Sequence, residues 1–326
     1  MTENFKSIDN IIVELKDILQ PIQQTKQLEL RKNQYPIGFI VGNPRSGTTL
    51  FLQWLSSLGC FAYPTNILAR FSYAPYIGAL IQRMLFEKQF DHFNELENLT
   101  DNSNFKSDLG KSQGALAPNE FHHFFRNYID KYFPEYLDKN EFDKVDTSGL
   151  FKDLSSIEYV FNKPFVTKGL MIQYNLYEFY KINPKCVFFQ INRDPFYVMQ
   201  SIYKSRKKYF DNINTWWSVK PKEYSELIKM DVFHQIAGQV YFTQKSLNSQ
   251  LEKIPDKNKI IIDYEKFCSM TSTYLEEILK KYKKNGCILQ PINLPIPNFK
   301  NSNVNLLSDE ITDSLKNAYI YFENNH

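Results

Sequence analysis

Short apolar runs alternate with helical patterns along most of the chain. Residues 36–42 (PIGFIVG) form an apolar run bounded by Pro and Gly, which predicts a buried strand. The next segment, residues 48–58, has the periodicity of a helix, and Gly59 is expected to end it. Its apolar residues fall at positions i, i+3, i+4 and i+7: Phe51, Trp54, Leu55 and Leu58.

The same alternation continues through the second half of the chain. Further strands are predicted at residues 164–168, 186–191 and 259–264, and helices at residues 195–208 and 271–284. Strands that alternate with helices predict an α/β fold with a central parallel sheet. Ligands of such folds bind at the carboxyl ends of the strands, so the connections after the strands are the candidate site.

The N-terminal segment lies outside this alternation. Residues 1–33 have one apolar stripe and predict a helical extension, which leaves residues 34–326 as a single domain. The stripe consists of Ile8, Ile11, Ile12, Leu15 and Leu19. The segment has no positive region followed by an apolar run, so it does not resemble a signal peptide.

Two other segments have a distinct composition. The longest apolar stretch, residues 71–86, is interrupted by Gln82 and Arg83, and a buried helix is expected there, with an acceptor-binding or interfacial helix as the alternative. Since no run of about 18 apolar residues exists, no membrane span is expected. The polar stretch 98–114 is expected to be a mobile segment near a site.

Composition narrows the class of protein. With 43% hydrophobic and 23% charged residues, the 326-residue chain is typical of a globular protein and is not a disordered chain, a collagen or a coiled coil. The net charge of +3 gives no overall field that would attract nucleic acid, so any affinity for anions must be local. The four cysteines form no C-x-x-C pair, which predicts free thiols in a reducing, cytoplasmic environment.

The first chemical motif is residues 42–49, GNPRSGTT, between the first predicted strand and helix. Its glycine spacing is that of a P-loop, but Thr48 stands where a P-loop has Lys. Small residues let successive N–H groups point at one anion, and the helix N-terminus adds its positive dipole end. Arg45 is then expected to carry the charge, unless the segment is an ordinary strand–turn–helix connection.

The second motif follows the third predicted strand and reads Ile191-Asn192-Arg193-Asp194-Pro195. Asp194 suits an N-cap and Pro195 the first helical position. Arg193 then lies at the carboxyl end of the strand, and Ser201 lies about two turns into the helix. A guanidinium and a hydroxyl that converge suit a phosphate monoester. The alternative is that the R-D-P turn only caps the helix.

Together the two motifs resemble the sulfotransferases that use 3′-phosphoadenosine 5′-phosphosulfate (PAPS). GNPRSGTT resembles the family's 5′-phosphosulfate loop, and NRDPFYVMQS resembles its 3′-phosphate-binding segment. The residues that this resemblance implies as donor-binding are Arg45, Ser46, Gly47, Thr48, Thr49, Arg193 and Ser201.

Other segments extend the resemblance over most of residues 36–270. PFVTKGL resembles the family's central strand, whose Lys, here Lys168, reaches the transferring group, and IIDYEKF resembles a later Tyr-Glu strand. AYPTNILARF, GALAPNEFHHFF and WWSVKPKEY resemble bacterial members of the branch related to Golgi and tyrosylprotein sulfotransferases. The implied fold is a single α/β, P-loop-kinase-like domain with a central parallel sheet of about five strands flanked by helices.

The base that removes the acceptor proton departs from the family patterns. Cytosolic members have a His two positions after the central Lys, where this chain has Leu170, and tyrosylprotein sulfotransferases have an acidic pair where this chain has residues 63–66, YPTN. Glu120 is the expected replacement, since a carboxylate among aromatic residues can act as a general base. The alternative for Glu120 is a structural role at the start of a helix.

Other bases stay open. His123 would share a helix face with Glu120 at i+3 and is the second candidate, and His122 is a weaker one. Asp263 and Glu265 flank Tyr264, and alternation along a strand would point both away from whatever Tyr264 faces.

The sequence therefore predicts a sulfotransferase that moves a sulfuryl group from PAPS to a hydroxyl and releases adenosine 3′,5′-bisphosphate. Arg45, Lys168 and Glu120 are the expected catalytic residues, and no metal is expected. The acceptor stays open among carbohydrates, lipids, small alcohols and peptide tyrosine, and the oligomeric state is not predicted. The alternatives are a P-loop-like nucleotide kinase, which Thr48 disfavours, and a non-catalytic PAPS-binding relative.

Overall fold

The computed structural model describes residues 8–29, 34–91, 95–96, 99, 107–108, 111–292 and 298–326. The strands are β1 (Gly38–Gly42), β2 (Ser107–Asp108), β3 (Lys111–Ser112), β4 (Val166–Lys168), β5 (Val187–Asn192) and β6 (Lys259–Asp263). The first helices are α1 (Ile8–Glu29), α2 (Thr48–Ser57), α3 (Pro75–Phe86), α4 (His122–Arg126), α5 (Lys139–Phe142), α6 (Thr147–Phe161) and α7 (Leu176–Ile182). The later helices are α8 (Pro195–Phe210), α9 (Tyr224–Leu227), α10 (Val232–Glu252), α11 (Tyr264–Ser269), α12 (Thr271–Lys284) and α13 (Asp309–Asn325).

The main sheet has the strand order β4-β1-β5-β6, and all its pairings are parallel. The predicted parallel α/β fold is therefore confirmed, with four strands among the described residues where about five were expected. β1 lies in the middle, with Gly38 opposite both Val166 and Val187. Because the strands are parallel, their carboxyl ends meet at one edge of the sheet, where Gly42, Lys168 and Asn192 lie close together.

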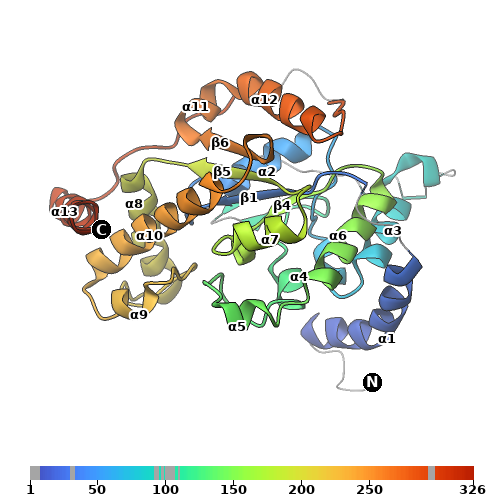
Figure 1. Cartoon of the computed structure of the whole chain (residues 1–326), viewed down its shortest axis with the longest axis horizontal. Helices are drawn as coiled ribbons and strands as arrows, with labels where there is room; N and C mark the ends of the chain where they lie inside the picture. The colour runs from blue at the N-terminus through green and yellow to red at the C-terminus, as the bar shows by residue number, and fades with distance from the viewer. Residues whose placement is uncertain are drawn as a thin grey trace.

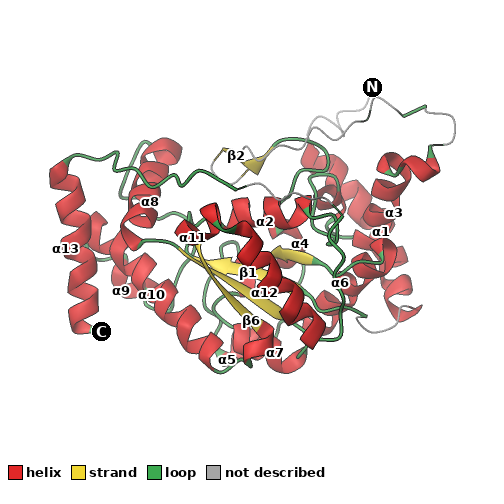
Figure 2. Cartoon of the chain, turned by 90° about the horizontal axis from the view of Figure 1, so that it is seen from above, coloured by secondary structure: helices red, strands yellow, loops and turns green. Residues whose placement is uncertain are grey.

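Helices cover both faces of this sheet (Figures 1 and 2). On one face Ile40 and Phe189 pack in a cluster with residues of α2, α11 and α12, and on the other Phe39 and Phe188 pack with residues of α4, α6 and α7. Neighbouring residues of a strand point to opposite faces, so both faces of these strands are apolar. This explains why the strands read as continuous apolar runs in the sequence.

A third apolar cluster joins α8, α10 and α13 at one end of the molecule. α10 and α13 lie side by side, with Phe322 of α13 near Phe242 of α10, and the chain ends there (Figure 1). This cluster carries the helix that follows the Asn192–Arg193–Asp194 turn. It therefore anchors one side of the candidate site.

The N-terminal helix α1 packs on α3 and α6. The buried side chain of Gln23 donates to Asp153 at 2.6 Å and accepts from the Tyr76 N–H at 3.1 Å. The helical prediction for this segment is confirmed over Ile8–Glu29, whereas its separation from residues 34–326 as an extension stays a prediction.

Two segments in the middle of the chain, residues 71–86 and 98–114, were predicted from their composition. The helix expected at residues 71–86 begins at Pro75, and it is amphipathic rather than buried, since Leu80 and Met84 are exposed. Most of the polar stretch 98–114 lies outside the described residues. Among the helices that the structure describes, none is both long and apolar enough to cross a membrane.

Candidate active site

The first motif forms a tight turn between β1 and α2 at the carboxyl edge of the sheet. Arg45 has φ +69° and Gly47 has φ +102°, and the Ser46 N–H donates to the Asn43 carbonyl at 3.1 Å. Gly47 is required there, because a Cβ on it would lie 2.5 Å from the ring of Tyr264. The turn thus ends directly at the N-terminus of α2, where no side chain caps the first N–H groups.

Two features of this loop fit an anion. The hydroxyl of Ser46 is completely buried and has no hydrogen-bond partner among the described residues. Unsatisfied N–H groups at a helix N-terminus and a buried hydroxyl donor are the groups that hold phosphate and sulfate oxygens. The residues of the loop therefore fit the 5′-phosphosulfate end of PAPS.

The second motif lies beside this loop, as the sequence predicted. Asp194 caps α8 through the Phe196 N–H, and Pro195 is the first helical residue. Arg193 donates from Nη1 to the Arg45 carbonyl at 2.9 Å, and Arg45 donates from Nε to the Ser201 hydroxyl at 3.0 Å. The fold therefore brings together Arg45, Arg193 and Ser201, three of the seven residues assigned to the donor from two separate motifs.

The C-terminal part of the chain completes this side of the site. Arg193 donates from Nε to Asn303 at 2.8 Å and from Nη2 to Ser302 at 3.2 Å, and its guanidinium lies 4.6 Å from the centre of the Tyr264 ring. Sequence reasoning did not select Ser302 or Asn303. No local pattern marks them, because they approach the site only through the packing of residues 298–308.

The secondary structure at Tyr264 differs from the prediction. It was expected on a strand, but β6 ends at Asp263, which caps α11 by accepting from the Lys266 N–H, and Tyr264 is the first residue of that helix. The argument from strand alternation about Asp263 and Glu265 is therefore wrong. Both carboxylates serve the turn instead, since Glu265 accepts from Asn303 and from the Asp194 N–H.

Lys168 ends β4 and lines the same cavity as Arg45 and Arg193. Its side chain is 2% exposed, and Nζ donates at 2.6 Å both to the Thr49 hydroxyl and to Oε1 of Glu120. A buried ammonium needs such partners, because an unpaired charge is costly in a medium of low dielectric constant. Lys168 thus joins the phosphate-binding loop to the carboxylate predicted as the base.

The carboxylate of Glu120 is 36% exposed, so a bound molecule can reach it. Burial is the largest single effect and acts to raise the pKa of Glu120, but the charge and hydrogen bond of Lys168, together with His122 and Arg45, outweigh it, so the pKa lies below its ordinary value. The group is therefore ionised at neutral pH and can accept a proton.

The two histidines differ from what the sequence suggested. Helix α4 begins only at His122, after Phe121 in a left-handed conformation, so Glu120 and His123 do not share a helix face. His123 is exposed, whereas Nε2 of His122 is buried 3.7 Å from Glu120 Oε2 and has no hydrogen-bond partner among the residues that the structure describes. Burial lowers the pKa of His122, so its imidazole is neutral at pH 7. His122 thus replaces His123 as the second candidate base.

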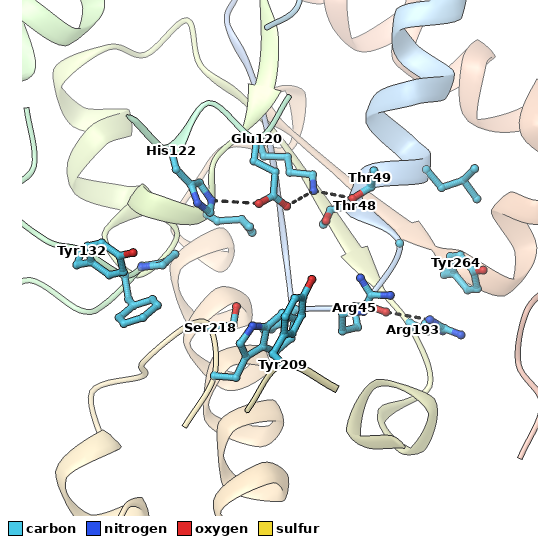
Figure 3. A pocket seen from close by; sticks show the side chains of 18 of the residues that line it. Arg45, Thr48, Thr49, Glu120, His122, Tyr132, Arg193, Tyr209, Ser218 and Tyr264 are labelled. Carbon is cyan, nitrogen blue, oxygen red and sulfur yellow. Dashed lines mark hydrogen bonds and ion pairs between the residues drawn. The ribbon is translucent and has the colours of Figure 1, made fainter. Parts of the chain in front are cut away.

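Most of the predicted site residues border one cavity of about 520 Å³ (Figure 3), namely Arg45, Gly47, Thr48, Thr49, Glu120, Lys168 and Arg193, whereas Ser46 and Ser201 are not among its lining residues. A volume of this size is ordinary for a small-molecule site. The figure shows Arg193 and Tyr264 on one side of Arg45, and Tyr132 and Tyr209 on the other. Lining residues that sequence reasoning did not select are Arg126, Tyr132, Phe133, Tyr209, Trp217 and Ser218. The WWSVKPKEY segment gave a signal for Trp217, but most aromatic residues in such a composition belong to the core.

A parallel sheet with a P-loop-like turn after its first strand defines the class as an α/β protein of P-loop-like architecture. Comparison with protein families gives the particular family. The model described as "Sulfotransferase family" matches residues 36–283, so the chain belongs to the sulfotransferase family.

Solved structures agree with this fold. Sulfotransferase STF9 from Mycobacterium avium has a TM-score of 0.51 and 13% identity, and the match covers 98% of this chain and 79% of that one. Sulfotransferase STF1 from Mycobacterium tuberculosis H37Rv has a TM-score of 0.50 and 13% identity, with 93% and 75% of the chains covered. Comparison with curated protein sequences finds no significant match. At this identity the structural likeness shows the fold alone.

Proposed function

We propose that the protein transfers a sulfuryl group from PAPS to a hydroxyl of an acceptor and releases adenosine 3′,5′-bisphosphate. The observation that carries this proposal is the convergence of Arg45, Lys168 and Arg193 on one loop at the N-terminus of α2. Membership of the sulfotransferase family supports it.

The donor would lie along the loop. The N–H groups of the loop and the hydroxyls of Ser46, Thr48 and Thr49 suit the oxygens of the phosphosulfate. Arg193 and Ser201 suit the 3′-phosphate, because a guanidinium fork binds phosphate oxygens strongly. When bound, PAPS supplies a sulfuryl group on a good leaving phosphate.

Positioning and charge then account for most of the rate enhancement. Lys168 and Arg45 stabilise negative charge that develops on the oxygens of the leaving phosphate, in a site where few waters compete. Glu120 is ionised and accessible, and we assign it as the base that takes the proton from the acceptor hydroxyl. His122 is the second candidate, because its unpartnered Nε2 is neutral and borders the same cavity.

A reducing, cytoplasmic environment is part of the proposal. The four cysteines are buried and free, which suits a compartment in which thiols stay reduced.

Thermal melting with two nucleotides, compared with the protein alone, tests the function. Adenosine 3′,5′-bisphosphate should raise the melting temperature, since a ligand that binds only the folded state stabilises it. ATP with magnesium should have a much smaller effect, and a larger effect of ATP would favour the kinase alternative. Radiolabelled PAPS then distinguishes an enzyme from a non-catalytic relative, because only an enzyme passes the label to an added acceptor.

A further inference from the structure

The cavity extends to the side of Arg45 away from Arg193, where Figure 3 shows Tyr132, Tyr209 and Ser218, into a region that the donor residues do not use. We call this region the acceptor half. Its main lining residues are Arg126, Tyr132, Phe133, Tyr209, Trp217 and Ser218. It is therefore a pocket of aromatic rings with one cation.

The two aromatic walls are held in place by buried hydrogen bonds. The Lys220 N–H donates to the Pro134 carbonyl at 2.8 Å, which ties the segment after Phe133 to the segment after Trp217. The buried amide of Gln239 donates to the carbonyls of Trp217 and Val219 at 2.8 and 2.7 Å. A pocket whose backbone is fixed in this way is preformed, and preformed walls lower the entropic cost of binding.

Arg126 is the charged residue among the main lining residues of the acceptor half. Its guanidinium lies 4.1 Å from the centre of the Tyr132 ring, and Nη2 donates to the Tyr132 carbonyl at 2.7 Å. Its Nε is buried without a hydrogen-bond partner, and no carboxylate pairs with it in the part of the chain that the structure describes. The guanidinium is therefore fixed in orientation but not neutralised.

Each of the other charged residues that line the cavity already has an ion-pair partner or lies on the donor side. Arg45, Lys168 and Arg193 lie on the donor side, and Glu120 is the single acidic residue among the described lining residues and pairs with Lys168. Arg126 is thus left with a positive charge that no described carboxylate neutralises and that the proposed donor residues do not use. Desolvating a guanidinium is costly, so a ligand that pairs with it gains specificity as well as affinity.

We propose that the acceptor of this enzyme is an anionic ring compound, whose hydroxyl reaches Glu120 while its carboxylate, or another oxyanion, pairs with Arg126. The ring would pack against the aromatic walls around Tyr132 and Trp217, which bury apolar ring faces well. The inference rests on the proposed function and adds the charge of the substrate class to it.

Calorimetric titration tests the proposal with a matched pair of probes, p-nitrophenyl β-D-glucuronide and the neutral p-nitrophenyl β-D-glucoside. The protein is titrated with and without saturating adenosine 3′,5′-bisphosphate. We expect the glucuronide to bind at least tenfold more tightly than the glucoside. Arg126→Gln should remove the difference, and Arg126→Lys should restore part of it, because Lys keeps the charge and loses the fork.

Lys222→Gln is the matched control, since it removes one positive charge from an exposed residue outside the cavity. It should leave the preference for the glucuronide unchanged. An unchanged melting temperature and an unchanged affinity for adenosine 3′,5′-bisphosphate show that the Arg126 variants fold.

Three results would overturn the inference: no binding of the glucuronide, equal affinity for both probes, or a preference that survives in Arg126→Gln. Failure of the proposed function gives a different result. In that case the protein does not bind adenosine 3′,5′-bisphosphate, independently of its affinity for the glucuronide and the glucoside. If it binds that nucleotide and prefers the glucoside, only the present inference is lost.

Discussion

Glu120 illustrates how neighbouring charges decide the state of a single residue. Its pKa is lowered chiefly by Lys168, which lies 2.6 Å away, against the opposing effect of burial. Because the folded pKa is depressed, the ion pair stabilises the protein above the ordinary carboxyl pKa, and this stabilisation is lost as the pH falls through the folded value. The ionised form of Glu120, which can accept a proton, is present over the same pH range.

We expect Glu120→Gln to lower kcat by about 10²–10⁴, because Gln keeps the shape of the side chain and cannot accept the proton. In the wild-type enzyme the acidic limb of kcat/KM should lie below the ordinary carboxyl pKa of about 4.3, and it should disappear in the variant. The affinity for PAPS should change little, since the proposed donor contacts lie elsewhere.

His122→Gln and His123→Gln separate the other candidates. His123 is exposed and outside the cavity, so its substitution should leave the pH–rate profile unchanged. An acidic limb that persists in Glu120→Gln and vanishes in His122→Gln would transfer the role of base to His122.

Arg193 gives a second prediction at the residue scale. Arg193→Ala should weaken PAPS binding by about ten- to a hundredfold, since a charge-assisted hydrogen bond contributes roughly 1.5–3 kcal/mol. Adenosine 5′-phosphosulfate, which lacks the 3′-phosphate, should lose much less affinity. Equal losses for both nucleotides would mean that Arg193 acts only by holding the Arg45 carbonyl and the 302–303 segment.

At the scale of elements, the turn between β1 and α2 depends on Gly47. Gly47→Ala should lower the affinity for adenosine 3′,5′-bisphosphate at least tenfold, because the added Cβ would overlap Tyr264 and the φ of +102° disfavours any other residue. The measurement is calorimetric titration together with thermal melting.

Gly286→Ala is the matched control for this substitution. Gly286 has φ +81°, and nothing lies within 4 Å of its added Cβ, so the variant should show the conformational cost alone. Nucleotide binding should be unaffected there. If Gly47→Ala lowers only the melting temperature, and by the same amount as Gly286→Ala, the turn does not bind the nucleotide.

At the scale of the whole molecule, the three cations that we propose for binding and transfer come from three distant parts of the chain. Arg45 follows β1, Lys168 ends β4 and Arg193 follows β5, so the parallel sheet itself assembles the positive site. The strand-ending Asp263 is used as the cap of α11, and Thr48 replaces the P-loop Lys. Both observations suit a reaction in which charged side chains, and not a metal ion, stabilise the group that is transferred.

We therefore expect sulfuryl transfer to proceed in excess EDTA at the rate measured without chelator. The check is initial velocity with and without EDTA, followed by addition of magnesium. A rate that EDTA abolishes and magnesium restores would contradict the prediction and favour the kinase alternative.

The sequence by itself determined the local structure and the donor motifs. The apolar runs predicted β1, β4, β5 and β6. β1 and β5, in the interior of the sheet, are apolar because both of their faces are covered, whereas Ile261 of the edge strand β6 is exposed. The turns around Arg45 and Arg193 could be predicted from the sequence, because loop glycines and helix caps depend only on a few neighbouring residues. Glu120 and Lys168 were reached through the resemblance to the family.

Tertiary structure alone decided which residues face one another. The predicted helix included Glu120, but α4 begins only at His122, after a left-handed Phe121, which brings His122 rather than His123 to Glu120. A one-residue difference in an element boundary turns a side chain by about 100°, and no local pattern specifies it. Arg126 lies one helical turn after His122 on α4, and the packing of this helix decides that both side chains border the cavity. Contacts between distant segments depend on the whole folded chain, so the acceptor half of the site could not be predicted from the sequence.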